Sequence, residues 1–409
     1  MSKSVMKSIA KADVAGKRVL VRADLNVPVR DGEITDATRI ERFLPTVKDL
    51  LERGAKVVIM SHFGRPKGKN VPEMSLLPVA QKLAHLLKDK HLLNAKVRFA
   101  ENCIGPAAQK AVGELENGQV ALLENLRFHE GEEANDEAFA KELAQLGDIY
   151  VNDAFSCSHR AHASTHAIAW NLPAYVGPSM KAELDALSAA LDTPKRPTAA
   201  IVGGAKVSTK IPVLTNLAKK MDMLVIGGGM ANTFMFAQGM NIGKSLCEPD
   251  FADEVHKIFA AAKESGCKIL LPIDVVVADE FKEGAHNITC DSADVADDET
   301  GMILDAGPKT VDMYKEHLQE CQTVLWNGPL GAFEIKPFGV ATFELAREAA
   351  RLSRENGLIS VAGGGDTVAA LNTAGVSEDF TYISTAGGAF LEWLEGRELP
   401  GVVALEIGN

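Results

Sequence analysis

Residues 358–371 read LISVAGGGDTVAAL, a pattern typical of a buried strand, a tight turn and the start of a helix. Three glycines form the turn, and they are followed by Asp366 and Thr367, which are residue types that commonly cap the N-terminus of a helix. Free backbone N–H groups and the helix dipole at such a turn attract anions. The stretch therefore predicts an anion site at the end of a strand in an α/β sheet.

The aspartate in this stretch adds a second expectation. A carboxylate beside a bound phosphate repels it unless a cation lies between them, so Asp366 indicates Mg²⁺. A single turn of this kind is more often structural, as a tight turn capped by aspartate. The functional interpretation depends on whether the pattern recurs along the chain.

Size and composition exclude several classes of protein. A chain of 409 residues is too long for one ordinary core, and 46% hydrophobic with 24% charged residues is typical of soluble globular proteins. We see no apolar run long enough for a bilayer and no apolar segment of a secretory signal near the N-terminus. The six cysteines are scattered without a C-x-x-C pair, and the net charge is −12. We therefore expect a cytoplasmic protein of two domains with reduced thiols, bound to neither nucleic acid nor membrane.

In the first half of the chain, four apolar stretches predict strands, and each is followed at once by polar or cationic side chains. The stretches are residues 17–21, 56–60, 120–124 and 149–151, and the side chains include Arg22, Asp24, Asn26, His62, Arg65, Arg127, His159 and Arg160. In open parallel α/β sheets, ligands bind beyond the carboxyl ends of the strands. Because four strands each place an Arg or His there, we expect a pocket for a small phosphorylated or carboxylated molecule.

Three histidines in this region have spacings that could suit a metal, namely His159, His162 and His166. No Cys or carboxylate completes an obvious ligand set, and Arg160 lies among them, where its charge would repel a metal ion. We therefore favour anion binding or packing for these histidines, and expect no structural metal.

The second half of the chain repeats the alternation with glycines in place of cations. Strands are predicted at residues 198–202, 223–226, 268–271, 323–326 and 382–384, and glycines follow most of them. Glycine at these positions lets the backbone approach a ligand closely. Lys206 and Lys210 are four residues apart, so we expect them on one face of a helix, where both could reach phosphates.

Residues 170–197 contain five Pro and Gly residues around the helical stretch MKAELDALSAALD. Breakers on both sides of a helix are typical of a connector between domains, although a helix inside one domain is the competing interpretation.

Other nucleotide motifs fail in this chain. Gly243-Lys244-Ser245 lacks the upstream glycine of a P-loop, because Gln238 stands in its place, and no G-x-G-x-x-G fingerprint is present. The missing fingerprint counts against a dehydrogenase on a doubly wound fold. A two-domain solute-binding protein without catalysis would normally carry an export signal, and none is seen.

Nine stretches together closely resemble the phosphoglycerate kinase family, nearly from end to end and in the family's order. They are RADLNVP, SHFGRP, LLENLRFHEGEE, VNDAFSCSHRAHAS, GGAKVSTKI, IGGGMANTF, WNGPLGAFE, GGGDT and STAGGAFLEWLEG. Departures are small: Ser156-Cys157-Ser158 stand where the family usually has Gly-Thr-Ala, Phe63 stands where Leu is commoner, and GPSM at residues 177–180 is unusual. None of these departures removes a charged ligand.

The resemblance implies two Rossmann-like parallel-sheet domains with a hinge helix and a cleft between them. Residues 1–175 would bind 3-phosphoglycerate or 1,3-bisphosphoglycerate, with the tail 397–409 packing back on them. Residues 176–197 would be the connector, and residues 198–396 would bind MgADP or MgATP.

The resemblance also implies the site residues. The substrate positions are Asp24, Asn26, Arg39, His62, Arg65, Arg127 and Arg160. The nucleotide positions are Gly203, Ala205, Lys206, Lys210, Gly228, Leu304, Asn327, Pro329, Glu334, Gly363, Gly364, Gly365, Asp366 and Thr367, with Asp366 as the metal ligand. The catalytic positions are Arg39, Lys206, Gly364 and Gly387.

The implied reaction is 1,3-bisphosphoglycerate + ADP ⇌ 3-phosphoglycerate + ATP, in a cytoplasmic monomer that closes around a hinge. Phosphoryl transfer depends on in-line placement and on positive charge around the moving group. The sequence offers no obvious general base. A carboxylate nucleophile is already ionised at pH 7, so this absence fits an acyl-phosphate reaction.

Overall fold

The computed structural model describes residues 6–30, 32–89, 97–296 and 300–407. Residues 1–5 of the segment inspected for a secretory signal, and residues 408–409 of the expected tail, lie outside the described residues. The chain divides into two compact units: Met1–Glu183 with Glu398–Asn409, and Leu184–Arg397. Within the described residues, no helix is both long enough and apolar enough to cross a membrane.

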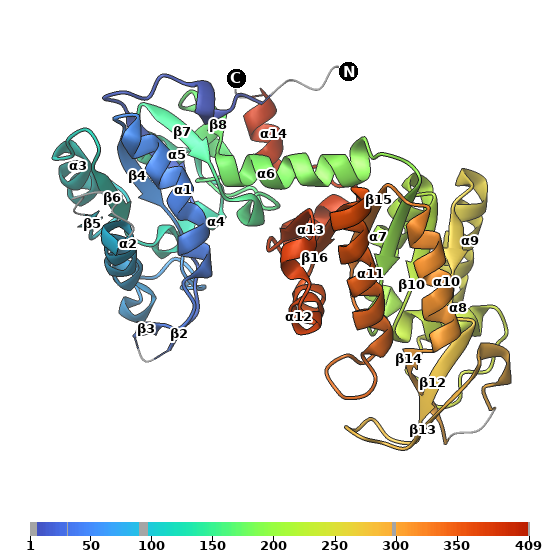
Figure 1. Ribbon diagram of the computed structural model, residues 1–409. Coiled ribbons are helices and arrows are strands. Elements are labelled where there is room, and N and C mark those ends of the chain that lie inside the picture. Colours follow the sequence, from blue (N-terminus) through green and yellow to red (C-terminus); the bar gives the residue numbers. More distant parts are fainter. Residues whose placement is uncertain (1–5, 31, 90–96, 297–299, 408–409) are drawn as a thin grey trace. The chain divides into compact units, whose positions relative to one another are not determined.

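The described part of the first unit is built on a six-stranded parallel sheet, with the order β5-β6-β4-β1-β7-β8 (Figure 1). Its strands are β1 (Arg18–Arg22), β4 (Lys56–Met60), β5 (Val97–Ala100), β6 (Val120–Leu123), β7 (Ile149–Asn152) and β8 (Ala174–Val176); a separate hairpin pairs β2 (Val29–Arg30) with β3 (Glu33–Ile34). The inner strands are apolar runs buried on both faces, as expected for a parallel sheet.

Helices follow the strands of this sheet and cover it. They are α1 (Thr38–Glu52), α2 (Leu77–Asp89), α3 (Gly105–Gly113), α4 (Glu130–Glu133) and α5 (Glu137–Ala144). In α1, buried residues recur every three or four positions, for example Ile40, Phe43, Leu44 and Val47, and this stripe packs with the alternate strand residues of one sheet face. Gly54, with a φ of 76°, follows the end of α1, where glycine readily takes a left-handed conformation.

The described part of the second unit contains another six-stranded parallel sheet, with the order β11-β10-β9-β15-β16-β17. Its strands are β9 (Thr198–Val202), β10 (Met223–Ile226), β11 (Lys268–Leu270), β15 (Thr323–Asn327), β16 (Ile359–Gly363) and β17 (Tyr382–Ser384). The prediction of two parallel-sheet units is thus confirmed.

No strand of the antiparallel sheet in this unit was predicted from the sequence. That sheet has the order β13-β12-β14 and consists of β12 (Asp274–Ala278), β13 (Asn287–Asp291) and β14 (Met302–Ala306). The middle strand is half-buried and its neighbour β13 is largely exposed. Strand β13 alternates polar and apolar residues, whereas β12 contains an apolar run at residues 275–278 that was not predicted as a strand.

The helices of the second unit are α7 (Ile211–Lys220), α8 (Gly229–Ala237), α9 (Ala252–Ser265), α10 (Pro308–Gln319), α11 (Val340–Asn356), α12 (Gly365–Ala374) and α13 (Gly388–Leu394). Apolar side chains of α10, α11 and α12 share one core cluster with alternate residues of the parallel sheet. Helices α7, α8 and α9 contact one another.

The expected helix between residues 180 and 192 begins two residues earlier. Helix α6 (Pro178–Leu187) starts with proline, whose fixed φ suits a first helical turn, and continues into a π turn, Ser188–Asp192. The division between the two units falls inside α6. The chain returns to the first unit at α14 (Pro400–Ile407), where Gly401 N donates to Ser158 O at 2.9 Å.

Candidate active site

Four neighbouring strands of the first unit, β6, β4, β1 and β7, deliver the polar side chains that the sequence singles out. Side chains that follow β1 and β6 hold the loop after β4 in place. Asn26 Oδ1 accepts a hydrogen bond from Gly64 N at 3.0 Å, and Arg127 Nη1 donates to Gly64 O at 2.9 Å. Loops from three strands are therefore fixed against one another at the carboxyl edge of the sheet.

Asp24 and Arg39 form the ion pair at this edge. Arg39 Nη1 lies 2.6 Å from Asp24 Oδ2, and the arginine side chain is 41% exposed while the aspartate is 14% exposed. Burial would raise the pKa of Asp24, but the charge of Arg39 and other neighbouring donors hold it below its usual value. The carboxylate thus stays ionised, and the exposed guanidinium remains available to an anion.

His62 is buried and its imidazole is held in one tautomer. Arg22 is fully buried, and its Nη2 lies 3.1 Å from His62 Nδ1. Because arginine can only donate, Nδ1 accepts and the ring proton lies on Nε2. Burial and the Arg22 charge lower the pKa of His62 well below its usual value. His62 is therefore a neutral hydrogen-bond donor, and not one of the cations that the sequence suggested.

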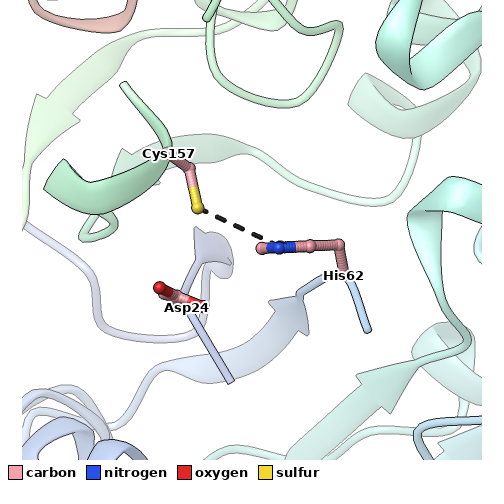
Figure 2. A group of neighbouring side chains, drawn as sticks. All are labelled: Asp24, His62 and Cys157. Carbon is pink, nitrogen blue, oxygen red and sulfur yellow. Dashed lines mark hydrogen bonds between the residues drawn. The ribbon is translucent and has the colours of Figure 1, made fainter. Parts of the chain in front are cut away.

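Figure 2 shows His62 with Asp24 and Cys157, whose Sγ lies 4.0 Å from His62 Nδ1. Among the described residues, these three side chains form the group whose ligand atoms lie close enough to hold a metal, within 4.8 Å of one another. Arg22 already occupies His62 Nδ1, and Arg39 occupies Asp24 Oδ2. Two guanidinium groups at the ligand atoms repel a cation, so this group suits an anion instead.

The three histidines weighed as metal ligands have other neighbours. His162 Nδ1 lies 4.0 Å from the buried Glu132, and His166 Nδ1 lies 3.1 Å from Asn135 Nδ2. Burial and the nearby arginines lower the pKa of His162 to about 4. These contacts give no support to a metal shared by the histidines.

The sequence did not indicate the buried network behind this site. Arg22 Nε donates to Ser164 Oγ at 2.8 Å, and Ser164 in turn donates through N and Oγ to the fully buried Glu132. Tyr150 Oη donates to Ser164 O at 2.7 Å. A glutamate inside the short helix α4 looks like a surface residue, and only its place in the stretch LLENLRFHEGEE could have drawn attention to it.

Two expected substrate residues, Arg65 and Arg160, are exposed at the ends of β4 and β7 respectively. The structure thus brings Asp24 and Arg39 into contact, places His62 beside them, and leaves Arg65 and Arg160 on the surface of the same sheet edge.

In the second unit, the expectation that Lys206 and Lys210 share a helix face is wrong. Lys206 precedes a short 3₁₀ turn, Val207–Thr209, and is exposed, whereas Lys210 turns inward before α7 begins. Lys210 Nζ donates to Gly203 O at 2.7 Å and to Asn327 Oδ1 at 2.7 Å. Burial lowers its pKa to about 8. Helix α7 begins at Ile211, after both lysines, so the simple i, i+4 argument does not apply to them.

Glycine is required where the loops after β9 and β15 meet. A Cβ at Gly203 would lie 1.8 Å from Pro329 O, and one at Gly328 would lie 2.1 Å from Gly203 O. Gly328 also has a φ of +112°, which side chains rarely adopt. These glycines bring two backbones into contact, which is a structural role that the sequence pattern alone could not separate from ligand binding.

Residues 358–371 contain strand β16 and the first turns of helix α12. The expected capping is wrong: the N-cap is Gly364, with a φ of 100°, and Asp366 lies exposed in the first turn. Thr367 Oγ1 instead accepts from Gly328 N at 2.7 Å, and Asn327 Nδ2 donates to Gly363 O at 2.7 Å. A Cβ at Gly365 would meet nothing within 4 Å. The helix N-terminus is therefore open, and its carboxylate has the oxygen chemistry that suits Mg²⁺.

The other expected nucleotide residues are spread around this edge. Ala205 and Glu334 are exposed, and Gly228 takes a φ of 66° before α8. Leu304 lies in β14 of the antiparallel sheet, where its carbonyl accepts from Ala332 N at 2.8 Å. Gly387 precedes α13 with a φ of 53°, and a Cβ there would meet nothing within 4 Å.

Sequence comparison connects this geometry to known proteins. The family model described as "Phosphoglycerate kinase" matches residues 9–397. A phosphoglycerate kinase from Chelativorans sp. (strain BNC1) is 60% identical over 394 residues, covering 96% of this chain and 97% of the relative. One from Rhizobium meliloti (strain 1021) is 59% identical over 397 residues, covering 97% and 98%.

Solved structures agree with the sequences. Phosphoglycerate kinase from Coxiella burnetii is similar with a TM-score of 0.91 at 42% identity, covering 98% of this chain and 99% of that chain. The enzyme from Pyrococcus horikoshii OT3 is similar with a TM-score of 0.79 at 31% identity, with the same coverage. The match spans both units, the glycine loops and the cationic edge, and the chain belongs to the phosphoglycerate kinase family.

Proposed function

We propose that the chain catalyses the reversible transfer of the acyl phosphate of 1,3-bisphosphoglycerate to ADP, giving 3-phosphoglycerate and ATP. The observation that carries the proposal is that one chain of this family contains two sheet edges with different chemistry. One edge gathers arginines and a neutral histidine, and the other gathers glycine turns and an open helix N-terminus. The first suits a small anion and the second suits a nucleotide.

We infer that the first unit binds the three-carbon substrate. Arg39, Arg65, Arg127 and Arg160 supply positive charge, and the Nε2–H of His62 supplies a neutral donor. Asp24 and Asn26 can accept hydrogen bonds from a substrate hydroxyl, in addition to holding Arg39 and Gly64. This combination fits a molecule that carries a phosphate, a carboxylate and a hydroxyl.

The second unit would bind the nucleotide at the carboxyl edge of its parallel sheet. The glycine turns at 203, 228 and 363–365 would bring backbone close to the phosphates, in addition to the packing role of Gly203, and Lys206 and Lys210 would supply charge. Asn327, Pro329, Thr367 and the neighbouring Leu304, Ala205 and Glu334 would complete the site. Asp366 would hold Mg²⁺, which screens the phosphate oxygens from one another when it is bound.

Catalysis in this proposal is electrostatic. Arg39 and Lys206, together with the backbone amides at Gly364 and Gly387, would stabilise the charge on the transferring phosphoryl group. No proton has to be removed from the acceptor, because a carboxylate is ionised at neutral pH. A reaction that needs no general base is consistent with a site whose histidine, His62, is neutral and accepts a hydrogen bond from Arg22 at Nδ1.

Transfer requires the two ligands to meet with water excluded, since hydrolysis of ATP is the competing reaction. We therefore propose that residues 176–197 act as a connector that allows closure, and that the enzyme works as a cytoplasmic monomer. Small-angle scattering would show a smaller radius of gyration with both ligands than with either one. An unchanged radius would contradict closure.

A coupled assay tests the function directly. Purified protein with 3-phosphoglycerate and MgATP should form a product that glyceraldehyde-3-phosphate dehydrogenase reduces, with loss of NADH absorbance, and chelation of Mg²⁺ should stop the reaction. A solute-binding protein would show ligand binding without turnover. A dehydrogenase would bind a nicotinamide nucleotide itself, and the absence of ATP-dependent turnover would contradict the proposal.

A further inference from the structure

The loop after β7 contributes a hydroxyl to the Asp24–Arg39 pair. Ser156 Oγ donates to Asp24 Oδ2 at 2.6 Å, and Arg39 Nη1 donates to the same oxygen at 2.6 Å. Strands β1 and β7 are neighbours with Arg22 opposite Asn152, so the residues that follow them meet at one edge of the sheet. A serine hydroxyl and a guanidinium thus share one carboxylate oxygen.

The remaining contact of the carboxylate is local. Asp24 Oδ1 accepts from Asn26 N at 3.2 Å, within the same turn. Among the hydrogen bonds of the described residues, the one from Ser156 ties Asp24 to the segment after β7, and the ion pair with Arg39 ties it to α1. Burial raises the pKa of Asp24, and the charge of Arg39 and the Ser156 hydroxyl both lower it.

We propose that Ser156 is a positioning residue that fixes the carboxylate of Asp24 and, through it, the guanidinium of Arg39 for the three-carbon substrate. Arg39 is 41% exposed on a long flexible side chain, so its orientation depends on its anchor. The Ser156 hydroxyl on Oδ2, together with the Asn26 backbone amide on Oδ1, fixes the orientation in which Asp24 faces Arg39. The residue lies in the Ser156-Cys157-Ser158 segment that departs from the family's usual Gly-Thr-Ala, and a glycine there could not supply the hydroxyl.

This inference rests on the proposed function, because it assigns Arg39 to the substrate. It predicts that Ser156→Ala raises the KM for 3-phosphoglycerate about three- to tenfold, which is the effect of one typical hydrogen bond lost, while the KM for ATP is unchanged. Ser156→Thr keeps a hydroxyl and should restore the KM. Ser158→Ala is the matched control, because the Ser158 hydroxyl donates to Ala154 O at 3.1 Å and not to Asp24.

A double-mutant cycle separates positioning from a general structural effect. In an Asp24→Ala background, the further change Ser156→Ala should leave the affinity for 3-phosphoglycerate unaltered, because the intermediary is gone. Affinity is measured by calorimetry and folding by thermal denaturation, so a variant that merely unfolds is recognised.

The outcomes are distinct for the two proposals. Wild-type protein without ATP-dependent turnover overturns the proposed function. Wild-type turnover with an unchanged KM in Ser156→Ala overturns the positioning role, as does an equal loss of affinity for both substrates or an additive effect in the Asp24→Ala background. A selective rise in the KM for 3-phosphoglycerate that Ser156→Thr reverses supports the role.

Discussion

Lys210 Nζ lies 2.7 Å from Asn327 Oδ1, joining the loop after β9 to the end of β15 across 117 residues of chain. The same ammonium donates to Gly203 O at 2.7 Å and to Asn327 O at 3.1 Å, so its three donors are all engaged. Lys210 therefore joins the neighbouring strands β9 and β15, and in the proposed function its charge would act on a nucleotide.

The burial of Lys210 predicts that the affinity for ADP falls at alkaline pH. Burial lowers the pKa of Lys210 to about 8, so its charge is lost as the pH rises above that value. The affinity for ADP should fall by up to about tenfold per pH unit above pH 8, and Lys210→Met should bind weakly at all pH values. The folded protein loses the proton of Lys210 near pH 8, whereas the unfolded chain keeps it up to about pH 10.5. The contribution of Lys210 to the free energy of unfolding therefore increases as the pH rises between these two values. Calorimetry with ADP at pH 7.5 and 9.5 is the check, and equal affinities in wild-type protein would disprove it.

His62 should behave as a neutral donor. The pKa of its imidazole lies well below the usual value, and Arg22 occupies Nδ1, so ¹⁵N NMR at pH 7 should show the tautomer protonated on Nε2. His62→Gln keeps both an acceptor for Arg22 and a donor, and should retain more affinity for 3-phosphoglycerate than His62→Ala. An imidazolium at pH 7, or equal loss in the two variants, would refute this assignment.

Two glycines near the nucleotide site should respond to alanine in opposite ways. Gly203→Ala places a methyl group 1.8 Å from Pro329 O, so it should lower the free energy of unfolding by about 1–3 kcal/mol or more. At Gly365 a Cβ meets nothing within 4 Å, so Gly365→Ala should keep the melting temperature but weaken ADP binding, because the methyl group stands where phosphates approach. Thermal denaturation and ADP titration of both variants provide the comparison. A stable Gly203→Ala variant would contradict the packing argument.

Lys206 is exposed, unlike Lys210, and is expected to act on the transferring group. Lys206→Ala should lower kcat about 10²- to 10³-fold, or about 2.7–4 kcal/mol, with little change in either KM. Lys219→Ala, at an exposed lysine in the last turn of α7, serves as the control and should leave the steady-state kinetics unaltered. If Lys206→Ala kept its kcat and bound nucleotide weakly, Lys206 would be a ground-state ligand.

Most strands of the two parallel sheets could be predicted because they are apolar runs followed by glycines or charges, but the edge strands β5 and β8 of the first sheet were not predicted. Residues 56–60, 198–202 and 223–226 match the observed strands at both ends. The antiparallel strands β12–β14 were missed: β13 is largely exposed and lacks an apolar run, and the short apolar run of β12 was not recognised as a strand. The alternation of strand and helix thus determined the fold class, and weaker local patterns did not reveal the smaller sheet.

The site residues could be placed at the correct edges, but not their individual contacts. Arg22 was expected with Asp24 and Asn26 among the side chains of a ligand pocket, yet Arg22 is fully buried against His62 and Ser164. The spacing of Lys206 and Lys210 suggested one helix face, yet the helix begins only after Lys210. Contacts such as Lys210–Asn327 join residues far apart in sequence, and no local periodicity reports them.

Each unit is proposed to bind its own ligand. Calorimetry with 3-phosphoglycerate and with ADP, each added separately, tests this most directly. Wild-type protein should bind each ligand alone. Arg39→Ala should lose affinity for 3-phosphoglycerate and keep its affinity for ADP, whereas Gly365→Ala should do the reverse, because the two residues belong to different units. A loss of both affinities in either variant, with the fold intact, would contradict the claim.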